Sequence, residues 1–233
     1  NGGADVILTR SDPSFVEQLF IQEVPEISDG TVTITNIVRE AGYRTKIVVS
    51  SNDRRVDPVG ACVGMRGTRI KNVIRELNNE KIDVIPHSED PIELLQNALD
   101  PIELRKIRIN EETNTVSLVV DDDDFAVVIG RRGMNARLNG RLINANLEVQ
   151  KLTEFKMASE IYRNELAEAE DSFLDEPLEL EGINILVLEN LIDAGFDTPR
   201  KLLTCELHEL EAVPGVSSDF ADELTDLLIK KRK

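Results

Sequence analysis

Tryptophan is absent from this 233-residue sequence, and only two cysteines and two histidines occur. Cys62 and Cys205 stand 143 positions apart (205 − 62) in different segments, so neither a disulfide framework nor a zinc site is indicated. His87 and His208 are isolated, and no Ser/His/Asp or metal-ligand spacing is present. The shortage of these residue types argues against an enzyme, and we expect no catalytic residue, metal or cofactor.

Long apolar runs are also missing. None approaches the ~20 residues needed to span a bilayer, and no signal-peptide pattern opens the chain. Hydrophobic residues make up 41% and charged residues 30%, as in soluble globular proteins. We therefore expect a cytoplasmic protein without membrane association, and its length suits two or three compact domains.

Positive charge is scarce, since 27 Lys and Arg against 44 Asp and Glu give a net charge of −17. Taken as one number, this charge would argue against nucleic-acid binding. It is unevenly distributed, however. Residues 1–170 hold 21 basic and 29 acidic residues (21 − 29 = −8), and residues 171–233 hold 6 and 15 (6 − 15 = −9). RNA binding would then depend on local basic clusters, and the acidic end of the chain would face another partner.

A short stretch containing two glycines occurs twice in the chain. In residues 127–138 an apolar run stops at Gly130, two arginines follow, and Gly133 precedes an amphipathic segment. Gly64 and Gly67 repeat this pattern 66 positions earlier (130 − 64 = 133 − 67 = 66). An internal repeat at a fixed spacing indicates a structural unit used twice.

The residue types of this stretch suit a partner that carries phosphate. Glycine has no Cβ, so a two-glycine turn allows unusual backbone angles and the close approach of another backbone. The second glycine opens a helix, whose free N–H groups and positive dipole end favour an anion. Guanidinium groups bind phosphate well, and five arginines lie in or just after the two turns: Arg66, Arg69, Arg131, Arg132 and Arg137. The apolar flanks, residues 61–63 and 126–129, would provide a floor for bases.

Two other structures could account for the stretch. A single Gly-x-x-Gly is more often a plain tight turn between helices, but two copies with the same flanks favour a binding loop. A nucleotide-binding P-loop needs Lys followed by Ser or Thr directly after its last glycine, whereas Thr68 and Met134 occupy that place. Asn135 could hydrogen-bond a base or cap its own helix.

The loop and its two helices resemble the KH domain, in which a Gly-x-x-Gly loop clamps four nucleotides of a single strand. Each repeat has the order helix, strand, strand, helix, loop, helix, strand, which is similar to the type II form of that family. The resemblance implies an α+β chain with two tandem type II KH domains, residues 11–88 and 89–170. Its RNA-binding residues would be Gly64, Met65, Arg66, Gly67, Arg69, Gly130, Arg131, Arg132, Gly133, Asn135 and Arg137.

Local signals support this order of elements. Asp12-Pro13 and Asp90-Pro91 mark the starts of two leading helices. Alternating apolar residues predict strands at residues 31–38, 46–49, 82–85, 106–109, 116–120 and 147–149. Because residues 86–88 are the only spacer between the repeats, we expect the two to pack as one body.

Residues 51–64 and 129–138 are similar to the KH signatures of a family of bacterial transcription elongation and termination factors. The resemblance implies an RNA-binding protein that holds nascent single-stranded RNA near RNA polymerase and modulates pausing, termination and antitermination. It further implies that residues 1–10 are the end of an S1 (OB-type) domain and that the chain is a fragment. Met134 departs from the glutamine expected there, and Met65 stands where proline is also common, so base preference could differ.

The last quarter of the chain is predicted to be a separate all-α domain. Residues 153–170 read as a charged helix covering the second repeat, and residues 171–181, acidic and containing Pro177, as a linker. The segment 182–233 resembles a helix-hairpin-helix module with its hairpin at residues 213–216.

The resemblance of this module leaves its partner open. In DNA-binding versions the hairpin amides hold a phosphate, which would make Gly215 a site residue. Acidic residues around the hairpin would repel phosphate, so a protein-binding role is favoured: Glu209, Glu211, Asp219 and Asp222. In some relatives such an acidic repeat contacts RNA polymerase or other factors. A protein scaffold acting through this module is therefore the alternative to RNA binding, and the acidic residues 121–124 near the second loop favour it.

Overall fold

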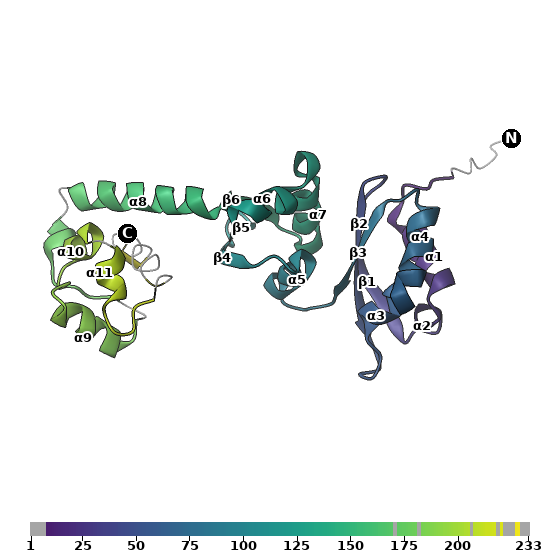
Figure 1. The fold of residues 1–233 in the computed structure, drawn as a ribbon, viewed down its shortest axis with the longest axis horizontal. Coiled ribbons are helices and arrows are strands. Elements are labelled where there is room, and N and C mark those ends of the chain that lie inside the picture. Colours follow the sequence, from purple (N-terminus) through teal and green to yellow (C-terminus); the bar gives the residue numbers. More distant parts are fainter. Residues whose placement is uncertain are drawn as a thin grey trace. The chain divides into compact units, whose positions relative to one another are not determined.

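The computed structural model describes residues 8–169, 172–180, 183–205, 207–217, 220 and 227–228, and Figure 1 shows their fold. The chain divides into two compact units, Asn1–Leu152 and Thr153–Lys233. Most of the S1 domain end expected in residues 1–10 falls outside the described residues, as do Asp219 and Asp222.

The first repeat follows the expected order of strands and helices. Its elements are α1 (Pro13–Glu23), α2 (Pro25–Ser28), β1 (Val32–Glu40), β2 (Arg44–Ser51), α3 (Pro58–Val63), η1 (Met65–Gly67), α4 (Thr68–Glu76) and β3 (Lys81–Pro86). The strands form one sheet in the order β1-β2-β3, in which β2 is antiparallel to β1 and parallel to β3.

The second repeat has the same order and the same sheet topology. Its elements are α5 (Pro91–Leu99), β4 (Leu104–Asn110), β5 (Thr115–Val120), α6 (Asp122–Ile129), η2 (Arg131–Gly133), α7 (Met134–Ile143) and β6 (Asn146–Lys151). Strand β5 is central, antiparallel to β4 and parallel to β6. The predicted α+β fold of two tandem repeats is confirmed.

Three helices begin with the same aspartate-proline device. Asp12, Asp57 and Asp90 each accept a hydrogen bond from a backbone N–H two residues further along, at 2.9, 3.1 and 2.9 Å, and proline follows each. The carboxylate satisfies an otherwise unpaired N–H group, and proline at the first helical position has a suitable φ without needing a donor. These caps fix where α1, α3 and α5 start.

Strand β2 is buried on both faces, which explains why Thr45 to Val49 do not alternate between buried and exposed. Ile47 and Val49 point into the core of the first repeat, whose helices lie on one face of the sheet (Figure 1). Lys46 and Val48 point the other way, toward the second repeat. Helices α5 and α7 cover that face.

The two repeats therefore share an apolar interface in addition to their separate cores. Its buried members are Val38, Val48 and Ile85 from the first repeat and Leu94, Leu138 and Leu142 from the second. Inside it, the ammonium of Lys46 lies 3.0 Å from an Asp83 carboxylate oxygen and donates to the carbonyl oxygen of Ala98 at 3.1 Å. Burial lowers the pKa of Lys46, against the opposing effect of Asp83. Both repeats thus belong to one compact unit.

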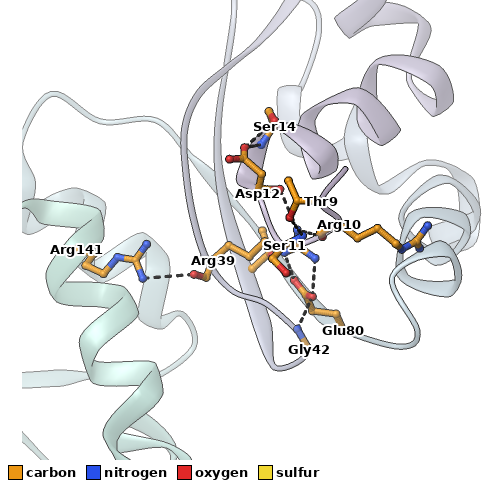
Figure 2. A network of polar contacts seen from close by, with 10 residues as sticks. Thr9, Arg10, Ser11, Asp12, Ser14, Arg39, Gly42, Glu80 and Arg141 are labelled. Carbon is orange, nitrogen blue, oxygen red and sulfur yellow. Dashed lines mark hydrogen bonds and ion pairs between the residues drawn. The ribbon is translucent and has the colours of Figure 1, made fainter. Parts of the chain in front are cut away.

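A buried ion pair ties the start of the described chain to the first sheet (Figure 2). The Arg39 guanidinium donates to both carboxylate oxygens of Glu80, at 2.8 and 2.9 Å, and these side chains are 4% and 1% exposed. Its remaining nitrogen donates to the carbonyl oxygens of Arg10 and Asp12 at 2.8 and 3.0 Å. Arg141 of α7 donates to the Arg39 carbonyl oxygen at 3.3 Å. One residue of β1 thereby contacts the segment before α1, the residue before β3 and the second repeat.

The second unit is helical. It contains α8 (Leu152–Glu168, whose first residue belongs to the first unit), η3 (Ser172–Asp175), α9 (Ile185–Asp193), α10 (Pro199–Thr204) and α11 (Leu207–Glu211). Its core is built from leucines and one valine: Leu174, Leu178, Leu180, Leu191, Leu202, Leu203, Leu210, Val213 and Leu228.

The structure differs from the prediction in two places before this module, helix α8 and residues 172–180. Helix α8 groups with the second unit from Thr153 on, and its Arg163 donates to the carbonyl oxygens of Leu202, Leu203 and Cys205 at 3.0 to 3.3 Å. Residues 172–180 are not a free linker, since three leucines of this acidic stretch are buried in the module's core.

In the part of the chain that the structure describes, no helix is both long enough and apolar enough to cross a bilayer.

We expect Glu80→Gln to destabilise the first unit by about 3 kcal/mol, because it leaves the buried Arg39 charge without its partner. Burial would raise the pKa of Glu80, but hydrogen bonds from Arg39, Thr45 and the Gly42 amide together lower it. A lowered folded-state pKa stabilises the fold above the ordinary value and loses this contribution as pH falls.

The difference between the two proteins should therefore be largest at about pH 7 and shrink below about pH 4.5. Urea unfolding followed by circular dichroism measures it, since the chain has no tryptophan. Glu76→Gln, at an exposed ion pair with Arg10, is the matched control. Equal stability of the Glu76 and Glu80 variants would contradict the importance of the buried pair.

Candidate nucleic-acid interface

The two Gly-x-x-Gly loops have the same backbone conformation. The first glycine has φ and ψ of 73° and 170° at Gly64 and of 67° and 178° at Gly130. The second glycine has a φ of 73° in both, at Gly67 and Gly133. Its N–H donates to the carbonyl oxygen of the first glycine, at 2.9 Å in one loop and 3.1 Å in the other. Each loop therefore reverses the chain within four residues.

The residue before the second glycine is an arginine in a left-handed conformation in both loops. Arg66 has a φ of 56° and Arg132 a φ of 53°. A residue with a Cβ costs roughly 1–2 kcal/mol in this region, and such strain concentrates at functional sites. The repeat of one strained angle at equivalent positions indicates a geometry that the loop requires.

The first glycine of each loop is needed for space as well as for its φ. A Cβ on Gly64 would lie 2.7 Å from the Cγ of Arg69, and one on Gly130 would lie 2.6 Å from the Cβ of Asn135. At Gly133 a Cβ would meet no atom within 4 Å, so that position is constrained by conformation alone.

Arg69 and Asn135, 66 positions apart (135 − 69), both bind the end of the helix before their loop. Arg69 donates to the Ala61 carbonyl oxygen at 2.7 Å and to a Glu26 carboxylate oxygen at 2.8 Å. Asn135 donates to the carbonyl oxygens of Val127 and Val128 at 3.0 and 3.2 Å. Both side chains fix the angle between the two helices. Asn135, predicted to contact a base or cap its own helix, satisfies the C-terminal carbonyls of α6.

Lys71 and Arg137, again 66 positions apart (137 − 71), brace the strained arginines. The Lys71 ammonium donates to the Arg66 carbonyl oxygen at 3.0 Å, and the Arg137 guanidinium donates to that of Arg132 at 3.0 Å. Arg137 was predicted from the sequence and Lys71 was missed. Applying the 66-residue offset to Arg137 would have found it. Both side chains are exposed, so their cationic ends lie at the loop surface.

The three arginines between the glycines are exposed. Within the described residues Arg66, Arg131 and Arg132 have no ion-pair partner, whereas Arg69 is paired with Glu26. Met65, beside Arg66, is 84% exposed. The arginines between the glycines are thus exposed, whereas Arg69 is occupied by Glu26 and the Ala61 carbonyl oxygen.

The apolar flanks provide less of a floor than the sequence suggested. Cys62 and Val128 are completely buried in their domain cores, and burial raises the pKa of the Cys62 thiol to about 12. Val127 is 58% exposed beside the second loop. Surface for bases therefore comes from part of each flank only.

The acidic residues 121–124 lie at the opposite end of α6 from the second loop. The Asp121 carboxylate binds Arg105 at 2.6 and 3.0 Å, and the following three aspartates form the first turn of the helix. An eight-residue helix is about 12 Å long, so these charges are separated from the loop by two turns. Among the described residues, no group of three His, Cys, Asp or Glu side chains is arranged to hold a metal ion.

Taken together, the fold and the paired loops define a protein with two tandem type II KH domains. Residues 10–87 match the family model of the NusA-like first KH domain, and residues 91–157 match that of the NusA-like second KH domain.

Three curated relatives share one printed name, transcription termination/antitermination protein NusA. That of Halalkalibacterium halodurans is 43% identical over 152 residues, covering 65% of this chain and 40% of the relative. Those of Borreliella burgdorferi and Rickettsia prowazekii are each 34% identical and match 97% of this chain, covering 50% and 44% of their own lengths. The chain belongs to the NusA family and spans about half the length of these relatives.

We expect Gly130→Ala to destabilise the protein more than Gly133→Ala. Gly133→Ala only places an alanine in the left-handed conformation, which should lower the free energy of unfolding by about 1 kcal/mol. Gly130→Ala also forces a methyl group against Asn135 and should lower the free energy of unfolding by about 3 kcal/mol. Thermal unfolding of the two variants measures the difference. Equal melting temperatures would show that the loop relaxes around the added methyl group.

Proposed function

We propose that this chain binds single-stranded RNA through its two Gly-x-x-Gly loops, and that it thereby holds nascent RNA near RNA polymerase to modulate pausing, termination and antitermination. The observation that carries the proposal is the pair of loops with one shared conformation, which present one exposed arginine (Arg66) and two (Arg131 and Arg132) without an ion-pair partner among the described residues. NusA relatives are named for termination and antitermination.

Each loop has the parts of a phosphate clamp. The glycines allow a nucleic-acid backbone to approach closely. Helices α4 and α7, nine and ten residues long, begin directly after the loops and direct their positive dipole ends there. The guanidinium groups of Arg66, Arg131 and Arg132 supply charge and hydrogen-bond donors. Arg69 and Asn135 contribute indirectly, because each fixes the angle between the two helices that flank its loop.

Two clamps in one compact unit favour a continuous strand over two separate ligands. Once one loop holds the RNA, the next nucleotides reach the other loop at a high effective concentration. The shared apolar interface between the repeats supports this, because it joins both loops within one compact unit. Affinity should then exceed that of either loop alone.

The negative net charge does not oppose this function. About half of it, −9 (6 − 15), lies in residues 171–233, and the loops themselves carry local positive charge. We infer that the acidic module binds protein, in keeping with the exposed Ile185, Leu186 and Ile192 of α9. RNA polymerase or other transcription factors are the proposed partners. A cytoplasmic location and a non-enzymatic role are part of the same proposal.

A scaffold that acts only through the acidic module is the second candidate. The exposed apolar residues of α9 favour this scaffold. It gives no role, however, to the two loops and their strained arginines. RNA titrations at increasing salt separate the two candidates, because binding through phosphate contacts weakens as salt rises. A scaffold would show no saturable RNA binding.

We expect Arg66→Asp and Arg132→Asp each to weaken RNA binding at least tenfold and to reduce the salt dependence. For single strands the slope of log K against log salt changes by about 0.7 for each phosphate that the protein no longer neutralises. Fluorescence anisotropy of a labelled single strand measures both quantities. Arg75→Asp makes the same charge change at the far end of α4 and is the matched control. An equal weakening in all three variants would place the RNA outside the loops.

A further inference from the structure

Tyr43 belongs to the first KH domain but reaches the second one. It lies in the turn between β1 and β2, and its ring packs against the apolar interface that the two domains share. Its backbone is held on both sides, since its N–H donates to Glu40 at 2.9 Å and its carbonyl oxygen accepts from Lys81 at 3.3 Å. These bonds hold the backbone of Tyr43, and its hydroxyl lies toward the second loop.

The Tyr43 hydroxyl lies beside the first glycine of the second loop. A methyl group on Gly130 would be 3.0 Å from the Tyr43 oxygen. At the equivalent Gly64, the nearest atoms all belong to Arg69 of the same domain. The second loop has the shorter Asn135 at that position. The first domain thus fills the place beside Gly130 that an arginine side chain fills beside Gly64.

This hydroxyl is available to a ligand. Tyr43 is partly exposed, and no described residue hydrogen-bonds its oxygen. A phenol at an apolar interface normally has a partner for its O–H. The guanidinium of Arg141 is already paired, since it lies 2.9 Å from a Glu40 carboxylate oxygen. The O–H is left as an unused neutral donor at the point where the second loop would receive a nucleic-acid backbone.

We propose that the second clamp is composite, and that the hydroxyl of Tyr43 donates a hydrogen bond to a phosphate oxygen of the RNA strand held at Gly130. This inference rests on the proposed RNA-binding function of the loops. It assigns to the first domain a ligand contact in the site of the second. The second loop should then bind RNA fully only when the first domain supplies Tyr43.

The test uses Tyr43→Phe in the full chain, with Tyr162→Phe as the control. These are the only two tyrosines, and Tyr162 lies on α8 in the other unit. Loss of a hydrogen bond to a charged oxygen should weaken RNA binding about tenfold, while Tyr162→Phe leaves it unchanged. The salt slope should stay constant, because the hydroxyl is neutral and the arginine contacts remain.

The melting temperature of free Tyr43→Phe should also equal that of the wild type. A lower melting temperature, or a reduced salt slope, would mean that the hydroxyl supports the loop, for instance through the unpaired oxygen of Asn135, and would overturn the proposal. Unchanged RNA affinity would overturn it too.

Double variants show at which of the two loops the Tyr43 hydroxyl contacts the RNA. In an Arg66→Ala background, binding depends on the second loop and Tyr43→Phe should keep its tenfold effect. In an Arg132→Ala background that effect should fall to about twofold or less, because neighbouring contacts to one phosphate are coupled. Equal effects in both backgrounds would contradict a contact in the second clamp. If neither Arg66→Ala nor Arg132→Ala weakens binding, the proposed function of the loops fails and this inference fails with it.

Discussion

The structure depends on a backbone constraint, the left-handed turn that joins two helices within four residues. Three of the four residues in each loop have positive φ, including one arginine, so the turn is stable only when its surroundings hold it. Arg69 and Asn135 bind the end of the helix before the loop, and Lys71 and Arg137 bind the carbonyl oxygen at the strained arginine. The side chains differ between the domains, but they make equivalent hydrogen bonds.

Around these turns, the burial of β2 on both faces makes the two domains one body. A central strand with helices of its own domain on one face and helices of the next domain on the other cannot move without exposing apolar surface. The Arg39–Glu80 pair extends this body toward the incoming segment, and Arg141 joins it to α7. The geometry of the loops is thereby set by contacts well outside them, as Tyr43 beside Gly130 illustrates.

Much of this fold follows from local sequence signals. Aspartate-proline pairs predict helix starts because they depend on neighbouring residues alone, and the 66-residue offset predicts the second domain because the same local pattern occurs twice. Long-range contacts could not be predicted in this way. Arg69 looks like a phosphate ligand until Glu26, 43 positions away (69 − 26), is seen beside it. Residues 172–180 look like a linker by composition, although their leucines find a core supplied by α9 and α10.

We propose that the two linked loops hold one continuous RNA strand. Measuring affinity against RNA length tests it most directly, starting from about four nucleotides, enough for one loop. We expect a steep rise in affinity at the length that first spans both loops, and the absence of that rise in Arg66→Ala. A gradual increase with length, unchanged by Arg66→Ala, would contradict the claim and show that the loops bind RNA separately or not at all.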